Sequence, residues 1–285
     1  MIRKVLNIMN QDFMIVNAID GIRNIKNSAL EKGISHFFVM EHREILGVIT
    51  TKELIEAHPN RIAADAMIQN FTKINVDTPI WKAKELLEKN MEILLVEENK
   101  KVVGFITTSL LDIELGKHID LLTGLYKSDY VYYHAAKFIK NRSEIAIIFM
   151  DVDNFGHVDK AYGHICGDNI LKDIGMLLNM YKHTDTYLCR FGGDEFMIVT
   201  PYTIEQAKAM VKEIMNAVAI HKFQDEIDIT ISAGIVKGRK YDNRITNPYA
   251  AVSQLINIAS LASTKAKKSK CKLSIVHETE IDESA

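Results

Sequence analysis

The stretch Arg190–Val199, RFGGDEFMIV, places two glycines and two acids between apolar residues. The runs Tyr187–Phe191 and Phe196–Val199 have the length and composition of strands. A Gly-Gly pair between two such runs supplies the positive φ angles that a tight turn needs. We therefore expect a β-hairpin that holds Asp194 and Glu195 at its turn.

A second acidic pair follows an apolar run about forty residues earlier. Ile145–Met150 is bounded by polar residues, which is typical of a buried strand, and it leads into Asp151-Val152-Asp153. Residues two apart in a strand share a face, so Asp151 and Asp153 are expected on one side. Each piece by itself is more typical of a solvated turn or strand end. If the strand and the hairpin lie side by side, three or four carboxylates meet, and such a cluster favours a hard divalent cation.

The second half of the chain carries six motifs that resemble those of the GGDEF family, the diguanylate cyclases. The resemblance covers roughly residues 119–277. The motifs, in chain order, are Asp120–Leu125 (DLLTGL), Asp151–Phe155 (DVDNF), Tyr162–His164 with Gly167-Asp168, Arg190-Phe191, Gly192–Phe196 (GGDEF) and Thr230–Ile235 (TISAGI).

This resemblance implies condensation of two GTP molecules into cyclic di-GMP on a palm-like α/β (α+β) fold. The sheet would be mixed or antiparallel and flanked by helices. Asp151, Asp194 and the backbone carbonyl of Val152 would hold Mg²⁺ or Mn²⁺. Glu195 would help to deprotonate the attacking 3′-hydroxyl or hold a second ion, and Lys267 would neutralise phosphate charge during catalysis.

The resemblance also implies how GTP would bind. The backbone amides of Asn154, Phe155 and Gly156 would cradle the terminal phosphates. Asp168 would accept hydrogen bonds from the guanine edge, and Asp159 would lie beside the substrate.

Several positions depart from the family pattern. Gly156 stands where the family usually has Lys, Asp159 where it has Asn, and Cys271 where it has Arg. Lys268, Lys270 and Lys272 follow closely and can compensate only as point charges. The product-inhibition motif RxxD is also missing, because its positions are His183 and Thr186. We therefore expect no feedback by cyclic di-GMP at that site.

The first 114 residues contain an internal repeat at a constant offset of 57 residues. Leu30–Ile34 matches Leu87–Met91, and Ile45–Thr51 matches Val102–Thr108. Two copies indicate a tandem domain rather than a solenoid. Each copy is expected to fold as helix, strand, turn, strand and helix.

This half resembles a tandem pair of CBS domains, which commonly bind adenine nucleotides. In that family a Thr or Ser, followed three residues later by Asp, often holds the ribose. Thr50 is followed by Glu53, whereas Thr107 is followed by Leu110. An adenine nucleotide is therefore a possible ligand at Thr50 and Glu53 and a doubtful one at Thr107. The alternative is that both threonines finish strands or cap helices, and that the pair serves for dimerisation.

The two expected domains are residues 1–114, the CBS pair, and 115–285, the GGDEF domain. Residues 109–122 join them and should form a short helix that ends near Gly116. This linker is either simply packed or a lever that transmits rearrangements.

The second domain should contain further helices and strands. We expect a helix from Ser128 or Asp129 to Lys140, a helix opened by Asp168, a helix capped by Thr203 and Gln206, a half-buried strand over 227–235, a helix over 250–268 and a strand over 273–276.

Composition limits location and partners. The net charge of −2 implies no nucleic-acid-binding surface. No apolar run is long enough to span a membrane, and no secretory signal is evident. Three cysteines without metal-type spacing fit a reducing cytoplasm.

Two functions follow as alternatives. The first is a cytoplasmic diguanylate cyclase, a homodimer regulated by its CBS pair. The second is a GGDEF domain with weak or no catalysis that acts as a nucleotide-responsive signalling regulator.

Overall fold

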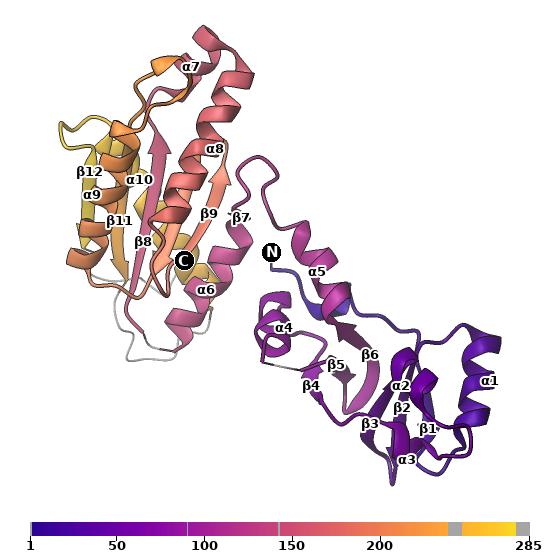
Figure 1. Cartoon of the computed structure of the whole chain (residues 1–285). Coiled ribbons are helices and arrows are strands. Elements are labelled where there is room, and N and C mark those ends of the chain that lie inside the picture. The colour runs from indigo at the N-terminus through magenta and orange to yellow at the C-terminus, as the bar shows by residue number, and fades with distance from the viewer. Residues whose placement is uncertain (1, 90, 142, 239–246, 278–285) are drawn as a thin grey trace. The chain divides into compact units, whose positions relative to one another are not determined.

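The computed structural model describes residues 2–89, 91–141, 143–238 and 247–277 (Figure 1). These residues fall into two compact units, Met1–Gly116 and Lys117–Ala285, which are described separately. No helix in the described ranges is long and apolar enough to cross a membrane.

The first unit contains the two expected repeats, and each of them gains a leading strand. Its elements are η1 Val5–Asn7, β1 Met14–Asn17, α1 Ile22–Lys32, β2 His36–Glu41, β3 Glu44–Thr50, α2 Thr51–Glu56, α3 Ala63–Ala66, β4 Phe71–Asn75, α4 Ile80–Leu87, β5 Ile93–Glu98, β6 Lys101–Thr107 and α5 Thr108–Gly116. The leading strands β1 and β4 pair parallel to β2 and β5, which in turn pair antiparallel to β3 and β6. The expected order of helix, strand, turn, strand and helix is confirmed. The linker helix α5 ends at Gly116, as expected.

The turns and bulges repeat at the same offset as the sequence. His42 and Arg43 have φ angles of 47° and 69°, and Asn99 and Lys100 have 49° and 64°. Two consecutive positive φ angles are the pattern of a type I′ hairpin turn. The repeat is therefore present in the backbone conformation as well as in the amino-acid sequence.

The segment that precedes each repeat pairs with the other repeat. Ile68, before β4, bridges Val48 of β3, and Asn10, before β1, bridges Phe105 of β6. A shared core joins the two sheets, and its buried members are Phe38, Val48, Ile93, Leu95 and Phe105. The two repeats therefore fold as one body.

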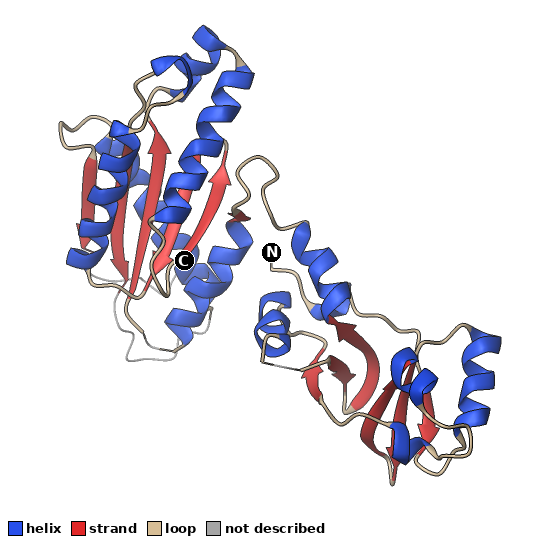
Figure 2. Cartoon of the chain, viewed as in Figure 1, coloured by secondary structure: helices blue, strands red, loops and turns tan. Residues whose placement is uncertain are grey.

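The second unit is built on a six-stranded mixed sheet with helices on both faces (Figure 2). Its elements are β7 Tyr126–Lys127, α6 Ser128–Lys140, β8 Ile145–Val152, α7 Phe155–Tyr162, α8 His164–Met180, β9 Tyr187–Gly192, β10 Glu195–Thr200, α9 Ile204–Ile220, η2 Gln224–Glu226, β11 Ile231–Gly238, α10 Pro248–Ala266 and β12 Leu273–His277. The strand order is β12-β11-β8-β10-β9-β7, with parallel pairs at the two edges and antiparallel pairs between them. The expected fold class, a mixed sheet flanked by helices, is confirmed.

Alternation along the central strand β8 creates two cores. Ala146, Ile148, Met150 and Val152 face the layer of α8 and α9. The intervening side chains of β8 face α6 and α10 on the other side of the sheet. Because both faces are covered, the central strand is apolar until it reaches Asp151.

Three boundaries differ from the expectations. Helix α8 begins at His164 rather than Asp168, because Gly163, with φ of 83°, already turns the chain into the helix. Strand β11 begins at Ile231 rather than 227, and it is buried on both faces rather than half-buried, because both helix layers cover it. Helix α10 covers Pro248–Ala266, since Pro248 suits a first turn.

Candidate active site at one end of the six-stranded sheet

The hairpin and the central strand lie side by side, as the sequence predicted. Strand β10 pairs antiparallel with β8 and places Glu195 opposite Asp151. Gly193, with φ of 45°, forms the turn, and Arg190 Nε donates to its carbonyl over 2.8 Å. The amide of Val152 donates to the Asp194 carbonyl over 3.2 Å. The turn is therefore fixed against the end of β8, beside α7 (Figure 1).

The carboxylates at this end of the sheet influence one another. Burial raises the pKa of Asp151, Lys267 opposes this, and Asp194 and Asp153 add to it. Burial, together with Asp151 and Asp194, also raises the pKa of Glu195. The cluster therefore favours a cation beside it. In this structure the ammonium of Lys267 supplies positive charge, 2.5 Å from Asp151 Oδ1.

Asp153 is held differently from Asp151. It lies just beyond β8 and accepts hydrogen bonds from Thr230 Oγ1 and Ser232 Oγ, each over 2.7 Å, and from Lys272 Nζ over 2.8 Å. Burial alone would raise its pKa, but these three donors outweigh burial and hold the pKa below its usual value. Asp153 is therefore satisfied by protein groups.

A polar pocket of about 290 Å³ opens at this point. Its lining residues are Val152, Asp153, Asn154, Phe155, Gly156, Asp194, Lys267 and Lys272. Asn154, with φ of 54°, turns the chain into α7, so the pocket lies at the beginning of that helix. Backbone amides at a helix N-terminus attract anions, and two lysines add positive charge. The pocket is thus lined by both acidic and basic side chains.

The donor set fits a hard cation. Within the described ranges no group of three or more His, Cys, Asp or Glu side chains could hold a metal ion. The predicted ligand set, the Asp151 and Asp194 carboxylates with the carbonyl of Val152, therefore stays a prediction. Oxygen donors of this kind suit Mg²⁺ or Mn²⁺.

Asp159 and Asp168 are not among the pocket's lining residues. Asp159 lies over Gly167, where an added Cβ would be 2.1 Å from Asp159 Oδ1, and its Oδ2 is 3.2 Å from His164 Nδ1. Asp168 is exposed on α8. Their roles toward a nucleotide stay predictions.

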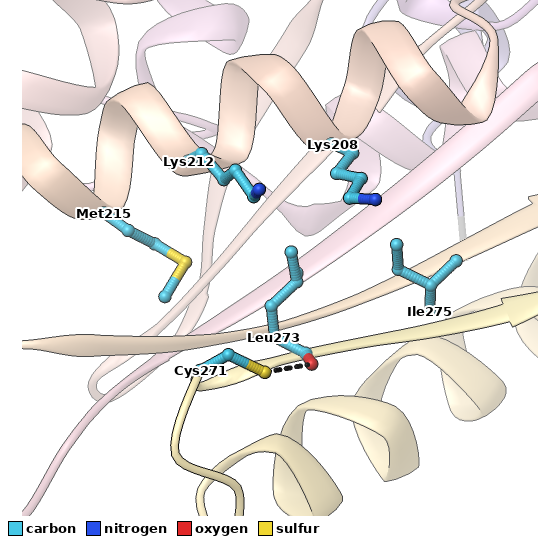
Figure 3. Close-up of a pocket in the computed structure, with 6 residues that line it drawn as sticks. All are labelled: Lys208, Lys212, Met215, Cys271, Leu273 and Ile275. Atoms are coloured by element: carbon cyan, nitrogen blue, oxygen red, sulfur yellow. Dashed lines mark hydrogen bonds between the residues drawn. The ribbon is translucent and has the colours of Figure 1, made fainter.

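One pocket residue, Lys272, was not singled out by the sequence. It appeared there only as one of three nearby lysines, and no spacing rule separated it from Lys268 or Lys270. Cys271, expected at the position of the family's arginine, lines a different groove of about 420 Å³ beside α9 (Figure 3).

The positions of the missing product-inhibition motif form a local turn. The hydroxyl of Thr186 donates to the carbonyl of His183, and Thr186 is buried. The two positions are therefore bonded to each other.

In the first unit, the two threonines of the expected nucleotide sites, Thr50 and Thr107, lie at helix starts and cap them. Thr50 and Glu53 form a capping box at the start of α2, in which Glu53 Oε2 accepts from the Thr50 amide over 3.0 Å and from its hydroxyl. Thr107 Oγ1 accepts from the Leu110 amide over 3.3 Å at the start of α5. The structural alternative for both threonines is thus realised, and a nucleotide would have to bind these groups in addition.

Comparisons with known proteins identify the families of both units. A family model described as diguanylate cyclase, GGDEF domain, matches residues 117–272, more than half of the chain, and a CBS domain model matches 5–60 and 63–111.

Individual relatives are distant. Diguanylate cyclase DgcS of Shewanella oneidensis is 26% identical over 161 residues, which are 55% of this chain and 53% of that protein. Diguanylate cyclase DgcP of Pseudomonas aeruginosa is 29% identical over 124 residues, 41% of this chain and 18% of that protein. The chain thus spans about half the length, or less, of these curated relatives.

Solved structures support the fold. The crystal structure of diguanylate cyclase SiaD of Pseudomonas aeruginosa, in complex with its activator SiaC, has a TM-score of 0.52 at 19% identity and covers 70% of each chain. The coiled coil and GGDEF domain of DgcB from Caulobacter crescentus, in complex with c-di-GMP, gives 0.51 at 16% identity, covering 69% of this chain and 97% of that one. The family models, together with this fold, show that the chain belongs to the GGDEF family of diguanylate cyclases and that two CBS domains precede its GGDEF domain.

Proposed function

We propose that this chain is a diguanylate cyclase that condenses two GTP molecules into cyclic di-GMP and releases pyrophosphate. The observation that supports this most is the intact set of Asp151, Asp194 and Glu195 beside Lys267, at one end of the sheet and next to a polar pocket. The set contains both the acidic and the basic groups that the reaction needs.

The reaction joins the 3′-oxygen of one GTP to the α-phosphorus of another, and pyrophosphate leaves. Asp151, Asp194 and the Val152 carbonyl would hold the divalent ion. That ion, when bound, activates the attacking oxygen and neutralises developing phosphate charge.

The chain's own groups complete the chemistry. Glu195, opposite Asp151 on the neighbouring strand, would help to deprotonate the 3′-hydroxyl or hold a second ion. Lys267 would exchange its contact with Asp151 for the phosphates once a metal occupies the acidic groups. The amides of Asn154, Phe155 and Gly156 would bind the terminal phosphates, Asp168 would accept hydrogen bonds from the guanine edge, and Asp159 would lie beside the substrate.

Each pocket would bind one GTP, so turnover needs two GGDEF domains facing each other. We infer a homodimer, with the CBS pair as the dimerising part. Sedimentation at micromolar concentration tests this, and a monomer both with and without nucleotide would contradict it.

A second function is a nucleotide-responsive regulator that binds GTP with little or no turnover. The specific observation in its favour is the loss of three family groups, at Gly156, Asp159 and Cys271. Each lost charged contact is worth about 1.5–3 kcal/mol, and about 1.4 kcal/mol is a factor of ten in affinity.

The CBS pair would regulate the domain by binding an adenine nucleotide near Thr50 and Glu53. Titration of AMP, ADP and ATP tests this. Thr50→Val should weaken binding, whereas Thr51→Val, an exposed neighbour, should not. Equal binding by both variants would remove Thr50 from the ligand site.

The activity itself is tested by incubating the purified chain with GTP and Mg²⁺ and identifying cyclic di-GMP by chromatography and mass. Product should be lost in Asp194→Ala and kept in Glu213→Ala, a matched exposed acid on α9. GTP binding without product in the unmodified chain would favour the regulator.

A further inference from the structure

Two lysines line the polar pocket, and they hold different acids. Lys267 Nζ lies 2.5 Å from Asp151 Oδ1, inside the proposed metal set. Lys272 Nζ lies 2.8 Å from Asp153 Oδ2 and 2.6 Å from Thr230 Oγ1, outside that set. The site therefore has a second cation that does not depend on the metal ligands for its position.

The backbone of Lys272 is fixed. Its amide donates to the Ser269 carbonyl over 3.2 Å, and its carbonyl accepts from the Ala233 amide over 2.9 Å. Its φ of 50° sets the turn between α10 and β12. Both ends of this side chain are thus held, the backbone by neighbouring segments and the ammonium by Asp153.

Cys271 points elsewhere. Its side chain lies in the groove between α9 and β12, together with Lys212 and Leu273, and its Sγ donates to the Leu273 carbonyl over 3.5 Å (Figure 3). A side chain at position 271 therefore faces the lysines of α9, while its neighbour at 272 faces the polar pocket. The family's arginine position and the phosphate pocket are separated in this chain.

The ammonium of Lys272 retains capacity for a ligand. A lysine ammonium has three donors, and the contacts to Asp153 and Thr230 use two of them. The side chain is 36% exposed, so the third donor can reach a bound anion. Gly156, in the same lining, leaves open space where a longer side chain would lie.

We propose that Lys272 is the second cation that binds the polyphosphate of GTP, and that it makes the pocket select nucleoside triphosphates over monophosphates. This rests on the proposed function insofar as GTP binds in this pocket. Lys272 supplies the positive charge toward the phosphates that Gly156 and Cys271 cannot supply.

The test is equilibrium binding to the full chain in Mg²⁺, by calorimetry. The probes are GMP and a GTP analogue with a methylene group between the α- and β-phosphorus atoms, which cannot release pyrophosphate. Lys272→Met should weaken binding of the analogue by about tenfold or more and change the affinity for GMP by less than about twofold. Lys270→Met, the same charge change two residues away on an exposed side chain, should leave both affinities unchanged. Lys272→Arg should retain most of the affinity for the analogue that Lys272→Met loses.

Equal analogue affinity in the unmodified chain and Lys272→Met would overturn the proposal. So would equal losses for the analogue and GMP, because Lys272 would then act on the fold and not on the polyphosphate. Absence of analogue binding by the unmodified chain would overturn it as well. Cyclic di-GMP formation by the unmodified chain is scored separately, so a cyclase with an irrelevant Lys272 is distinguishable from a chain that is no cyclase.

Discussion

Substitution of Gly156 by lysine should strengthen GTP binding. Gly156 is the second residue of α7, it lines the polar pocket, and a Cβ added there meets no heavy atom within 4 Å. A lysine can therefore extend without displacing a neighbour. The variant would return a positive charge to the beginning of α7.

The magnitude follows from three effects. A hydrogen bond to a charged group contributes about 1.5–3 kcal/mol, and the open position favours the lower end, so we expect about tenfold tighter binding. Replacing glycine in a helix stabilises it by about 0.5–1 kcal/mol. A cation in the first turn opposes the helix dipole by about 0.3–1 kcal/mol, so the free energy of unfolding should change little.

The assay is calorimetric binding of the methylene-bridged GTP analogue, with thermal unfolding as a check. Gly156→Ala is the control, because it adds the Cβ without the charge and should leave affinity unchanged. If Gly156→Lys binds the analogue no more tightly than Gly156→Ala, or if GMP binding improves by the same factor, the added ammonium does not contact the polyphosphate.

Three further outcomes are expected. Burial alone would raise the pKa of Asp120, but hydrogen bonds from Thr123 and Arg190 outweigh it and lower that pKa; its stabilisation is therefore present above about pH 4 and lost as the pH falls through the lowered pKa. At neutral pH, Asp120→Asn should lower the free energy of unfolding by about 1–3 kcal/mol, and it should weaken the fall of the melting temperature at acid pH. Exposed Asp112→Asn should change neither quantity. The same pH dependence of the melting temperature in Asp120→Asn and in the unmodified chain would contradict this. Gly234→Ala should destabilise the second unit by about 3 kcal/mol, because the added Cβ would lie 2.1 Å from the Ala259 carbonyl oxygen of α10. Gly116→Ala should be tolerated, because a Cβ added there meets open space. Equal melting temperatures for the two variants would count against this packing. If the unmodified chain makes cyclic di-GMP, added product should not inhibit it through positions 183 and 186, and inhibition relieved by Thr186→Ala would show the opposite.

The sequence predicted the elements whose signals are local. The Gly-Gly turn, the apolar run before Asp151 and the capping box of Thr203 and Gln206 each determine their own backbone, and all three are present. The repeat in the first unit was equally readable, because the same turn and bulge recur at the same offset.

Boundaries set by distant contacts were not readable in this way. Alternation over 227–235 suggested a half-buried strand, but β11 is covered on both faces, by α9, which precedes it, and by α10, which follows it. The start of α8 was placed four residues late, because the conformation of Gly163 has no counterpart in periodicity.

The site shows the same division. The adjacency of Asp151 and Glu195 followed from motif order and strand pairing. The capture of Asp153 by hydroxyls of Thr230 and Ser232, and the choice of Lys272 over its neighbours, depend on which way a turn directs successive side chains. The spacing of residues along the chain does not predict the direction in which these side chains point.

We propose that the acids at the end of β8 and β10 carry out GTP condensation. The most direct measurement quantifies cyclic di-GMP and pyrophosphate from the same reaction with GTP and Mg²⁺. We expect two pyrophosphates for each cyclic di-GMP, and loss of both products in Asp194→Ala. Bound GTP without either product, or product that persists in Asp194→Ala, would contradict it.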